Sequence, residues 1–194
     1  TTTTRAAEAA AATLEGGEQA ISFPSGLAAV AGALLPFVSA GDHLLVADNI
    51  YLPARRFCDD ILKRYGVETQ YFDPLLGSEV RNLFRPETKA IYFESPGSQS
   101  FEVMDVPTVC SVAHDNSVMT IMDNTWSAGF YFKPFDHGVD VVVQAATKYF
   151  SGHADAMLGF VISDKKYGAA IKTTAIRFGT CAGPDVCYMG LRGL

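Results

Sequence analysis

Two side chains in the second half of the chain are suited to chemistry on an aldehyde. Lys148 comes shortly after the apolar stretch 139–144, and Asp123 comes directly after the apolar stretch 118–122. If both stretches are buried strands, desolvation favours the neutral lysine amine, which attacks aldehydes. A carboxylate in the same setting requires a positively charged partner, because burying an unpaired charge costs free energy. Each residue also has an ordinary explanation: Lys148 could extend to the surface, and Asp123 could cap a turn or pair with an arginine.

Two earlier apolar stretches end in residues that could hold other parts of a ligand. The segment Phe23-Pro-Ser-Gly-Leu27 leads into a helix, and Gly26 allows a tight turn there. The first amides of that helix lack partners within it and could bind an anion. An ordinary turn with Ser25 as the helix N-cap explains the same residues. Tyr51 could stack on a flat ligand, or it could be a surface aromatic residue.

The order of these residues is more informative than any one of them. An anion-binding turn, an aromatic residue, an aspartate and a lysine follow four of the expected strands in this order, with the last two 148 − 123 = 25 positions apart. Pyridoxal 5'-phosphate (PLP) needs amides for its phosphate, a carboxylate for its ring nitrogen and a lysine for its aldehyde. The order therefore predicts a PLP pocket. His153 could add a general base, although a structural role in a turn is the simpler interpretation.

The elements that position these residues are predicted to alternate between strands and helices. Strands are expected over 19–23, 43–47, 67–72, 88–93, 118–122, 139–144 and 158–162. Helices are expected over 26–37, 51–65, 106–116 and 164–177. This alternation is typical of βαβ units and predicts an α/β fold with a mostly parallel central sheet flanked by helices. Ligands of such sheets lie beyond the carboxyl ends of the strands, where the candidate residues are placed.

The composition of the chain and the motifs that it lacks argue against several other classes of function. The chain has 194 residues, a formal net charge of −6 and no basic cluster, which argues against nucleic-acid binding. No apolar run could span a bilayer and no signal peptide opens the chain, so a cytoplasmic location without membrane association is expected. The four cysteines lack zinc-ligand spacing, so free thiols and no metal site are expected. No G-x-G-x-x-G follows the first strand, which leaves little support for a nucleotide-binding Rossmann domain.

Six motifs resemble those of the Cys/Met-metabolism family of PLP enzymes, also called the transsulfuration family. They are Leu14-Glu-Gly-Gly17, Phe23-Pro-Ser-Gly-Leu-Ala-Ala-Val30, Glu94-Ser-Pro-Gly-Ser98, Phe101-Glu-Val-Met-Asp-Val-Pro107, Asp123-Asn-Thr-Trp126, and Gln144-Ala-Ala-Thr-Lys-Tyr149 with Gly152-His153. The resemblance covers essentially the whole chain, and Thr-Lys-Tyr with Gly-His is its most specific part. Glu-Ser-Pro-Gly-Ser and Asp-Asn-Thr-Trp are most similar to the bacterial cystathionine β-lyase branch.

The resemblance implies a role for three residues around the cofactor ring. Lys148 would hold the cofactor aldehyde covalently and later move the α-proton of the substrate. Asp123 would pair with the ring nitrogen. Tyr51 would stack on the ring and help activate the incoming amino group. Lys148 and Tyr51 are therefore the expected catalytic residues.

The resemblance also implies a phosphate site and a domain. The amides of Gly26 and Leu27 and the hydroxyl of Thr147 would hold the cofactor phosphate. Ala145 stands where other members have a phosphate-binding serine, which removes one hydroxyl contact. Residues 1–194 would form the PLP-binding large domain of fold type I, the aminotransferase-like fold.

The reaction implied by the resemblance is carbon–sulfur lysis of a sulfur-containing amino acid. β-Elimination of cystathionine, or of another cysteine S-conjugate, would yield homocysteine or another thiol, pyruvate and ammonia. A γ-acting relative, such as a cystathionine γ-lyase or γ-synthase, is the alternative within the family. A non-catalytic binding protein that keeps the fold is an alternative of another class, although the retained candidate residues argue against it.

Both ends of the chain differ from those of the longer family members. We expect the chain to lack an N-terminal arm, which reaches the phosphate of a neighbouring subunit in relatives, and a C-terminal domain, which grips the substrate carboxylate. Little or no activity is therefore expected from the 194 residues alone. Because the family's active site lies at a subunit interface, a homo-oligomer is also expected.

Overall fold

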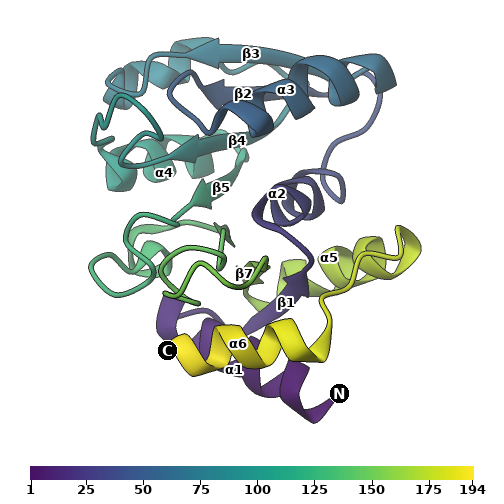
Figure 1. The fold of residues 1–194 in the computed structure, drawn as a ribbon. Helices are drawn as coiled ribbons and strands as arrows, with labels where there is room; N and C mark the ends of the chain where they lie inside the picture. The colour runs from purple at the N-terminus through teal and green to yellow at the C-terminus, as the bar shows by residue number, and fades with distance from the viewer. The chain divides into compact units, whose positions relative to one another are not determined.

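The fold is α/β, and the computed structural model describes all 194 residues (Figure 1). The strands are β1 (Gln19–Phe23), β2 (His43–Ala47), β3 (Glu68–Phe72), β4 (Thr88–Glu94), β5 (Met119–Asp123), β6 (Val141–Gln144) and β7 (Gly159–Ser163). The α-helices are α1 (Thr2–Glu15), α2 (Gly26–Leu34), α3 (Leu52–Arg56), α4 (Val106–Asp115), α5 (Lys165–Arg177) and α6 (Pro184–Gly193). Strands β1-β7-β6 are neighbours in this order, as are strands β5-β4-β2-β3, and their alternation with helices along the chain confirms the predicted α/β fold.

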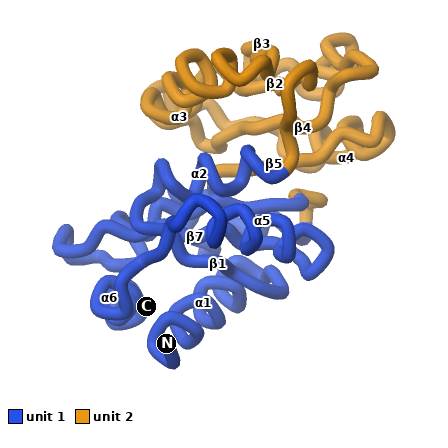
Figure 2. The backbone as a smooth tube through the Cα atoms, turned by 90° about the vertical axis from the view of Figure 1, so that its right-hand side faces the viewer, with its two compact units in different colours: residues 1–36, 124–136, 140–194 blue, residues 37–123, 137–139 orange.

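The chain divides into two compact units, which Figure 2 shows in different colours. The first unit contains Thr1–Pro36, Asn124–Asp136 and Asp140–Leu194. The second unit contains Phe37–Asp123 and His137–Val139. Strands β1, β7 and β6 therefore belong to the first unit, and strands β5, β4, β2 and β3 belong to the second.

In the first unit, β7 lies between β1 and β6 and runs antiparallel to both. All residues of β6 and β7 are buried. Helix α1 packs against β1 and lies beside α6, while α2 packs against β6 and β7 (Figure 1). The start of α2 and the chain after β6 are therefore neighbours within one unit.

In the second unit, β5, β4, β2 and β3 form parallel pairs. All five residues of β2 are buried, and only Lys89 of β4 is exposed, as is typical of central parallel strands covered on both faces. The edge strand β3 is fully buried only at Phe72. Helix α4 packs on β5 and on a 3₁₀-helix over Gly77–Leu83.

The structure adds detail to the sequence-based expectation in three places: the direction of β7 and the extents of two helices. The last strand, β7, runs antiparallel to β6 within the mostly parallel sheet, because the chain reaches it through the loop 145–158, which has no crossover helix. The helix expected over 26–37 ends at Leu34, since Pro36 has no amide hydrogen with which to continue it. The helix expected over 51–65 is α3 followed by a π-helix over Phe57–Leu62 and a 3₁₀ turn.

The helices do not provide a membrane span. None of them combines the length and the apolar composition that crossing a bilayer requires. The four cysteines are free, and only Cys181 is exposed. No group of three or more His, Cys, Asp or Glu side chains is gathered as a metal site would require.

His43 is a buried titratable group at the edge of the sheet where β2 and β4 begin. Its Nδ1 lies 2.8 Å from Oγ1 of Thr88. Burial lowers the pKa of His43 and the Arg85 charge lowers it further, against smaller opposing contributions from Glu68 and Glu87. At mildly acidic pH the folded protein therefore holds a neutral imidazole, whereas the unfolded chain binds a proton.

This difference predicts a loss of stability on acidification. The His43 contribution is fully present above the unfolded-state pKa of about 6.5 and is lost as the pH falls toward the folded-state value. Urea unfolding at a series of pH values should show a smaller decline for His43→Gln than for the parent. His137→Gln, at an exposed position, serves as the control. Equal slopes for the parent and His43→Gln would contradict the prediction.

Candidate active site

The turn between β1 and α2 presents a helix N-terminus. Ser25 is the N-cap, as expected, and its Oγ accepts a hydrogen bond from the Ala28 amide at 3.1 Å. The first helical hydrogen bond runs from the Ala29 amide to Ser25 O at 3.0 Å. The amides of Gly26 and Leu27 lie ahead of that bond and have no acceptor in the helix. They are suitably placed donors for an anion.

Gly26 brings this turn against the loop that follows β6. A Cβ at this position would lie 2.7 Å from the Cβ and 3.1 Å from the Cα of Ala145. Side chains do not approach so closely, so glycine permits the packing. The loop 145–158 carries Thr147 and Lys148, and the candidate phosphate turn therefore lies in the same unit as the candidate lysine.

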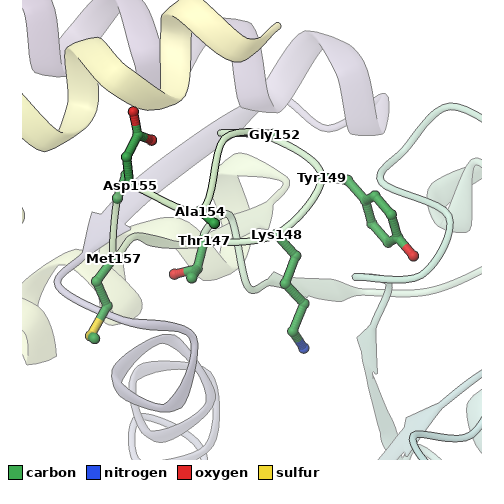
Figure 3. A pocket seen from close by; sticks show the side chains of 8 residues that line it. Thr147, Lys148, Tyr149, Gly152, Ala154, Asp155 and Met157 are labelled. Atoms are coloured by element: carbon green, nitrogen blue, oxygen red, sulfur yellow. The ribbon is translucent and has the colours of Figure 1, made fainter.

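Lys148 lines a cavity in the first unit (Figure 3). The cavity has a volume of about 890 Å³, which lies within the roughly 300–1,000 Å³ of small-molecule sites. It is lined by Thr147, Lys148, Tyr149, Gly152, Ala154, Asp155, Ala156 and Met157. The Lys148 side chain leaves the loop on the side away from Asp155. Lys148 is exposed, so burial within this chain does not supply the desolvation that the sequence suggested.

The hydroxyl of Thr147 is already engaged by the backbone of Leu158. Its Oγ1 accepts a hydrogen bond from the Leu158 amide at 2.9 Å and donates to Leu158 O at 3.2 Å. A hydroxyl has one proton, and a phosphate oxygen can only accept. Contact with a phosphate would therefore require the Thr147 proton to turn away from Leu158 O, while the bond from the amide is kept.

Asp155 on the cavity wall and His153 in the same loop have structural partners. Asp155 pairs with Arg192 of α6 at 2.7 Å, and the hydrogen bond from Arg192 lowers the pKa of Asp155. His153 places its Nδ1 2.6 Å from Ser151 O in the same loop. This contact agrees with the structural interpretation of His153 rather than with a role as a general base.

The other two candidates, Asp123 and Tyr51, lie in the second unit. Asp123 is the last residue of β5 and is 5% exposed. Tyr51 is the N-cap of α3 and is 38% exposed, and its amide donates to Glu94 Oε2 at 2.8 Å. Glu94 ends β4, where it is the register partner of Asp123. Two buried carboxylates therefore end neighbouring parallel strands.

The pKa of Tyr92 is affected by burial and by these two carboxylates. Burial first, and then the charges of Asp123 and Glu94, raise the pKa of Tyr92 well above its usual value. The phenol oxygen is buried and has no hydrogen-bond partner. Tyr92 therefore remains a neutral phenol beside Asp123 throughout the physiological pH range.

The structure thus distributes the six candidate residues between the two units. Gly26, Leu27, Thr147 and Lys148 lie in the first unit, whereas Tyr51 and Asp123 lie in the second. Glu94, which holds the Tyr51 backbone, was not among the residues expected at the site. Its signal was present, since Glu94 ends an apolar stretch and opens the Glu-Ser-Pro-Gly-Ser motif.

Gly159 packs closely against the N-terminus of α2. A Cβ on this first residue of β7 would lie 2.8 Å from the carbonyl carbon of Ser25 and 2.9 Å from Cβ of Ala29. Because the obstacle at Ser25 is backbone, Gly159→Ala must displace the first turn of the helix. Overpacking of this kind costs about 1–3 kcal/mol of unfolding free energy.

Gly159→Ala should therefore destabilise the fold and also weaken binding of PLP by more than about tenfold, since the α2 amides move. Chemical denaturation and a PLP titration measure the two effects. Gly41→Ala is the control, because a Cβ there meets nothing within 4 Å although its φ is +91°. It should cost stability without changing PLP affinity. Equal PLP affinities for both variants would contradict the prediction.

The residues present fit PLP. Unpaired amides on an open helix N-terminus suit a phosphate, and a lysine on a cavity suits an aldehyde. A buried carboxylate at a strand end suits a protonated ring nitrogen. When bound, the cofactor supplies an electron sink for bonds to the substrate α-carbon.

Comparison with known proteins agrees with this class of site. A family model described as "Cys/Met metabolism PLP-dependent enzyme" matches residues 1–194. The chain belongs to this family, whose members are PLP-dependent enzymes.

Three relatives show the range of activities among similar proteins. Cystathionine beta-lyase MetC of Escherichia coli is 43% identical over 93% of the chain and 46% of its own length. An L-alanine/L-glutamate racemase of Wolbachia pipientis is 36% identical over 95% of the chain and 45% of its own length. The crystal structure of cystathionine gamma-lyase from Lactobacillus plantarum, complexed with L-serine, superposes with a TM-score of 0.95 at 33% identity, covering 98% of this chain and 50% of that one. The chain thus spans about half the length of the relatives it matches.

Proposed function

We propose that this chain is the PLP-binding large domain of a carbon–sulfur lyase that performs β-elimination on cystathionine or another cysteine S-conjugate. The observation that carries the proposal is Lys148, which lines a cavity in a chain of the PLP-dependent family. The 43% identity to a cystathionine β-lyase supports the choice of β-elimination. The products would be a thiol, pyruvate and ammonia. We also propose a cytoplasmic homo-oligomer, and the strongly exposed Phe130 and Tyr131 support self-association.

In this proposal the phosphate, the ring nitrogen and the substrate α-proton are each handled by different residues of the chain. The amides of Gly26 and Leu27 bind the phosphate and orient the cofactor. The carboxylate of Asp123 holds a proton on the ring nitrogen, which keeps the ring electron-poor. The amine of Lys148 accepts the proton from the substrate α-carbon, because Lys148 is the basic side chain among the residues that line the cavity.

Tyr51 and Thr147 have supporting roles in the proposal. Tyr51 presents its aromatic face to the cofactor ring, and Glu94 fixes the backbone from which it extends. Thr147 offers its hydroxyl to the phosphate after releasing Leu158 O.

γ-Elimination is the second candidate, because the superposed structure is a cystathionine γ-lyase. The two reactions differ in the carbon from which sulfur departs, and therefore in the keto acid released. β-Elimination of cystathionine releases pyruvate, and γ-elimination releases 2-oxobutyrate. Product composition separates the candidates directly.

The experiment is a product analysis with cystathionine after loading with PLP, in which chromatography identifies the keto acid. Pyruvate with homocysteine supports the proposal, and 2-oxobutyrate with cysteine supports the γ-acting candidate. Release of neither product, despite a PLP adduct on Lys148, would support PLP binding by these 194 residues and would count against lysis by them alone. S-Methylcysteine, which has only a β-leaving group, serves as the control substrate.

A further inference from the structure

Glu15 is a fully buried carboxylate that the proposed chemistry does not use. It is the last residue of α1 and is 0% exposed. Asn124 Nδ2 donates to its Oε2 at 2.8 Å, and Gln144 Nε2 donates to its Oε1. Both donors are themselves buried, at 0% and 1% exposure. A carboxylate so far from solvent requires donors on both oxygens, and these two carboxamides provide them.

The two donors lie close in sequence to the candidate residues Asp123 and Lys148. Asn124 follows Asp123 directly, and Gln144 ends β6 four residues before Lys148. Gln144 Nε2 also donates to Asn124 O at 2.7 Å. Glu15 therefore joins the segment that follows the candidate aspartate to the segment that precedes the candidate lysine.

Hydrogen bonds of the surrounding backbone and a close approach at Gly129 support this arrangement. Asn124 N donates to Val143 O at 3.0 Å, and the Ala145 amide donates to Thr125 Oγ1 at 2.9 Å. Gly129, with φ +68°, lets the turn after β5 approach, because a Cβ there would lie 2.9 Å from Cδ of Glu15. The Lys148 amide donates to Ala145 O at 3.0 Å, which continues the connection to the lysine.

We propose that Glu15 is a positioning residue of the PLP site: its carboxylate, held by Asn124 and Gln144, sets the two chain segments that carry Asp123 and Lys148. The proposal rests on the proposed PLP-dependent function. Glu15 is fully buried, and in this proposal it acts through the two carboxamides. Both oxygens matter because an N–H donor faces each of them, and an amide side chain offers only one acceptor oxygen.

Glu15→Gln is the direct test. The new amide must turn one of its N–H groups toward an existing N–H donor, so one of the two bonds is lost. Amide hydrogen exchange over 124–132 and 145–151 should accelerate about tenfold, and PLP should bind about tenfold more weakly. The visible absorbance band of bound PLP and its pH dependence should also change, which a purely structural loss elsewhere would not produce.

Glu8→Gln is the matched control. Glu8 lies on the same helix, and its Oε1 accepts bonds from Ser22 N at 3.0 Å and Ser22 Oγ at 2.9 Å. This variant also removes a carboxylate with two donors, but neither donor adjoins Asp123 or Lys148. It should leave exchange in the two segments, PLP affinity and the absorbance band at the parent values.

Gln144→Met provides a second variant if Glu15→Gln does not fold. It removes one donor while keeping the length of the side chain, and it should change exchange and PLP affinity in the same direction. The inference is overturned if Glu15→Gln and Gln144→Met both match Glu8→Gln in the two segments and in PLP affinity. A parent chain that binds no PLP would count against the proposed function, and the exchange measurement would still decide the role of Glu15.

Discussion

Lys148→Ala is expected to abolish the covalent attachment of PLP. The parent chain, incubated with PLP and reduced with borohydride, should gain the mass of one cofactor on the peptide that contains Lys148. The variant should gain none, because alanine has no amine to bond the aldehyde. Any β-elimination by the parent should fall by about 1,000-fold or more, since both the covalent bond and a general base are lost.

Two further variants show whether covalent attachment of PLP depends on the amine of Lys148 or only on a positive charge. Lys148→Arg keeps the positive charge, but its guanidinium stays protonated and cannot attack an aldehyde. It should behave like the alanine variant in the reduction experiment. Lys172→Ala, at an exposed position of α5, should retain the adduct. An adduct on another lysine in Lys148→Ala, with activity retained, would contradict the assignment.

Asp123→Asn is expected to have the second-largest effect, mainly on the chemical step. The change is nearly isosteric at a residue that is 5% exposed, so the fold should persist. The neutral amide cannot hold a proton on the cofactor ring nitrogen, and the developing negative charge loses its electron sink. Removal of one such electrostatic contribution lowers kcat by about 100- to 1,000-fold.

A comparison of binding with turnover tests this interpretation of Asp123. PLP should still attach to Lys148 in Asp123→Asn, with a larger loss in kcat than in PLP affinity. Asp115→Asn, at an exposed position at the end of α4, should match the parent in both measurements. A variant that keeps full turnover would show that Asp123 has only a structural role.

Much of the fold could be predicted because local pattern and burial agree. The strands at 19–23 and 43–47 match the expected boundaries, since each is a short apolar run flanked by turn residues. Ser25 was expected as an N-cap, and its hydroxyl caps α2. Asp123 was expected after a strand and is the final residue of β5, a shift of one position within the usual uncertainty of boundaries.

Other features depended on contacts that no local pattern records. The direction of β7 follows from the path of the loop 145–158 and from pairing with β1, whose Phe23 faces Gly159 across 136 positions (159 − 23 = 136). The exposure of Lys148 is likewise a property of the folded chain, because an apolar stretch before a lysine does not determine what lies over its side chain.

By itself, the sequence determined the class of the fold, the order of the chemical groups at the strand ends and the family to which the chain belongs. Strand and helix periodicity and short motifs carry this information within a few residues of each site. Only the tertiary structure decided that Glu15 receives hydrogen bonds from Asn124 and Gln144, which lie 109 and 129 positions away. Such contacts form because a buried carboxylate must be satisfied by whichever donors packing brings to it, and packing is decided by the whole chain.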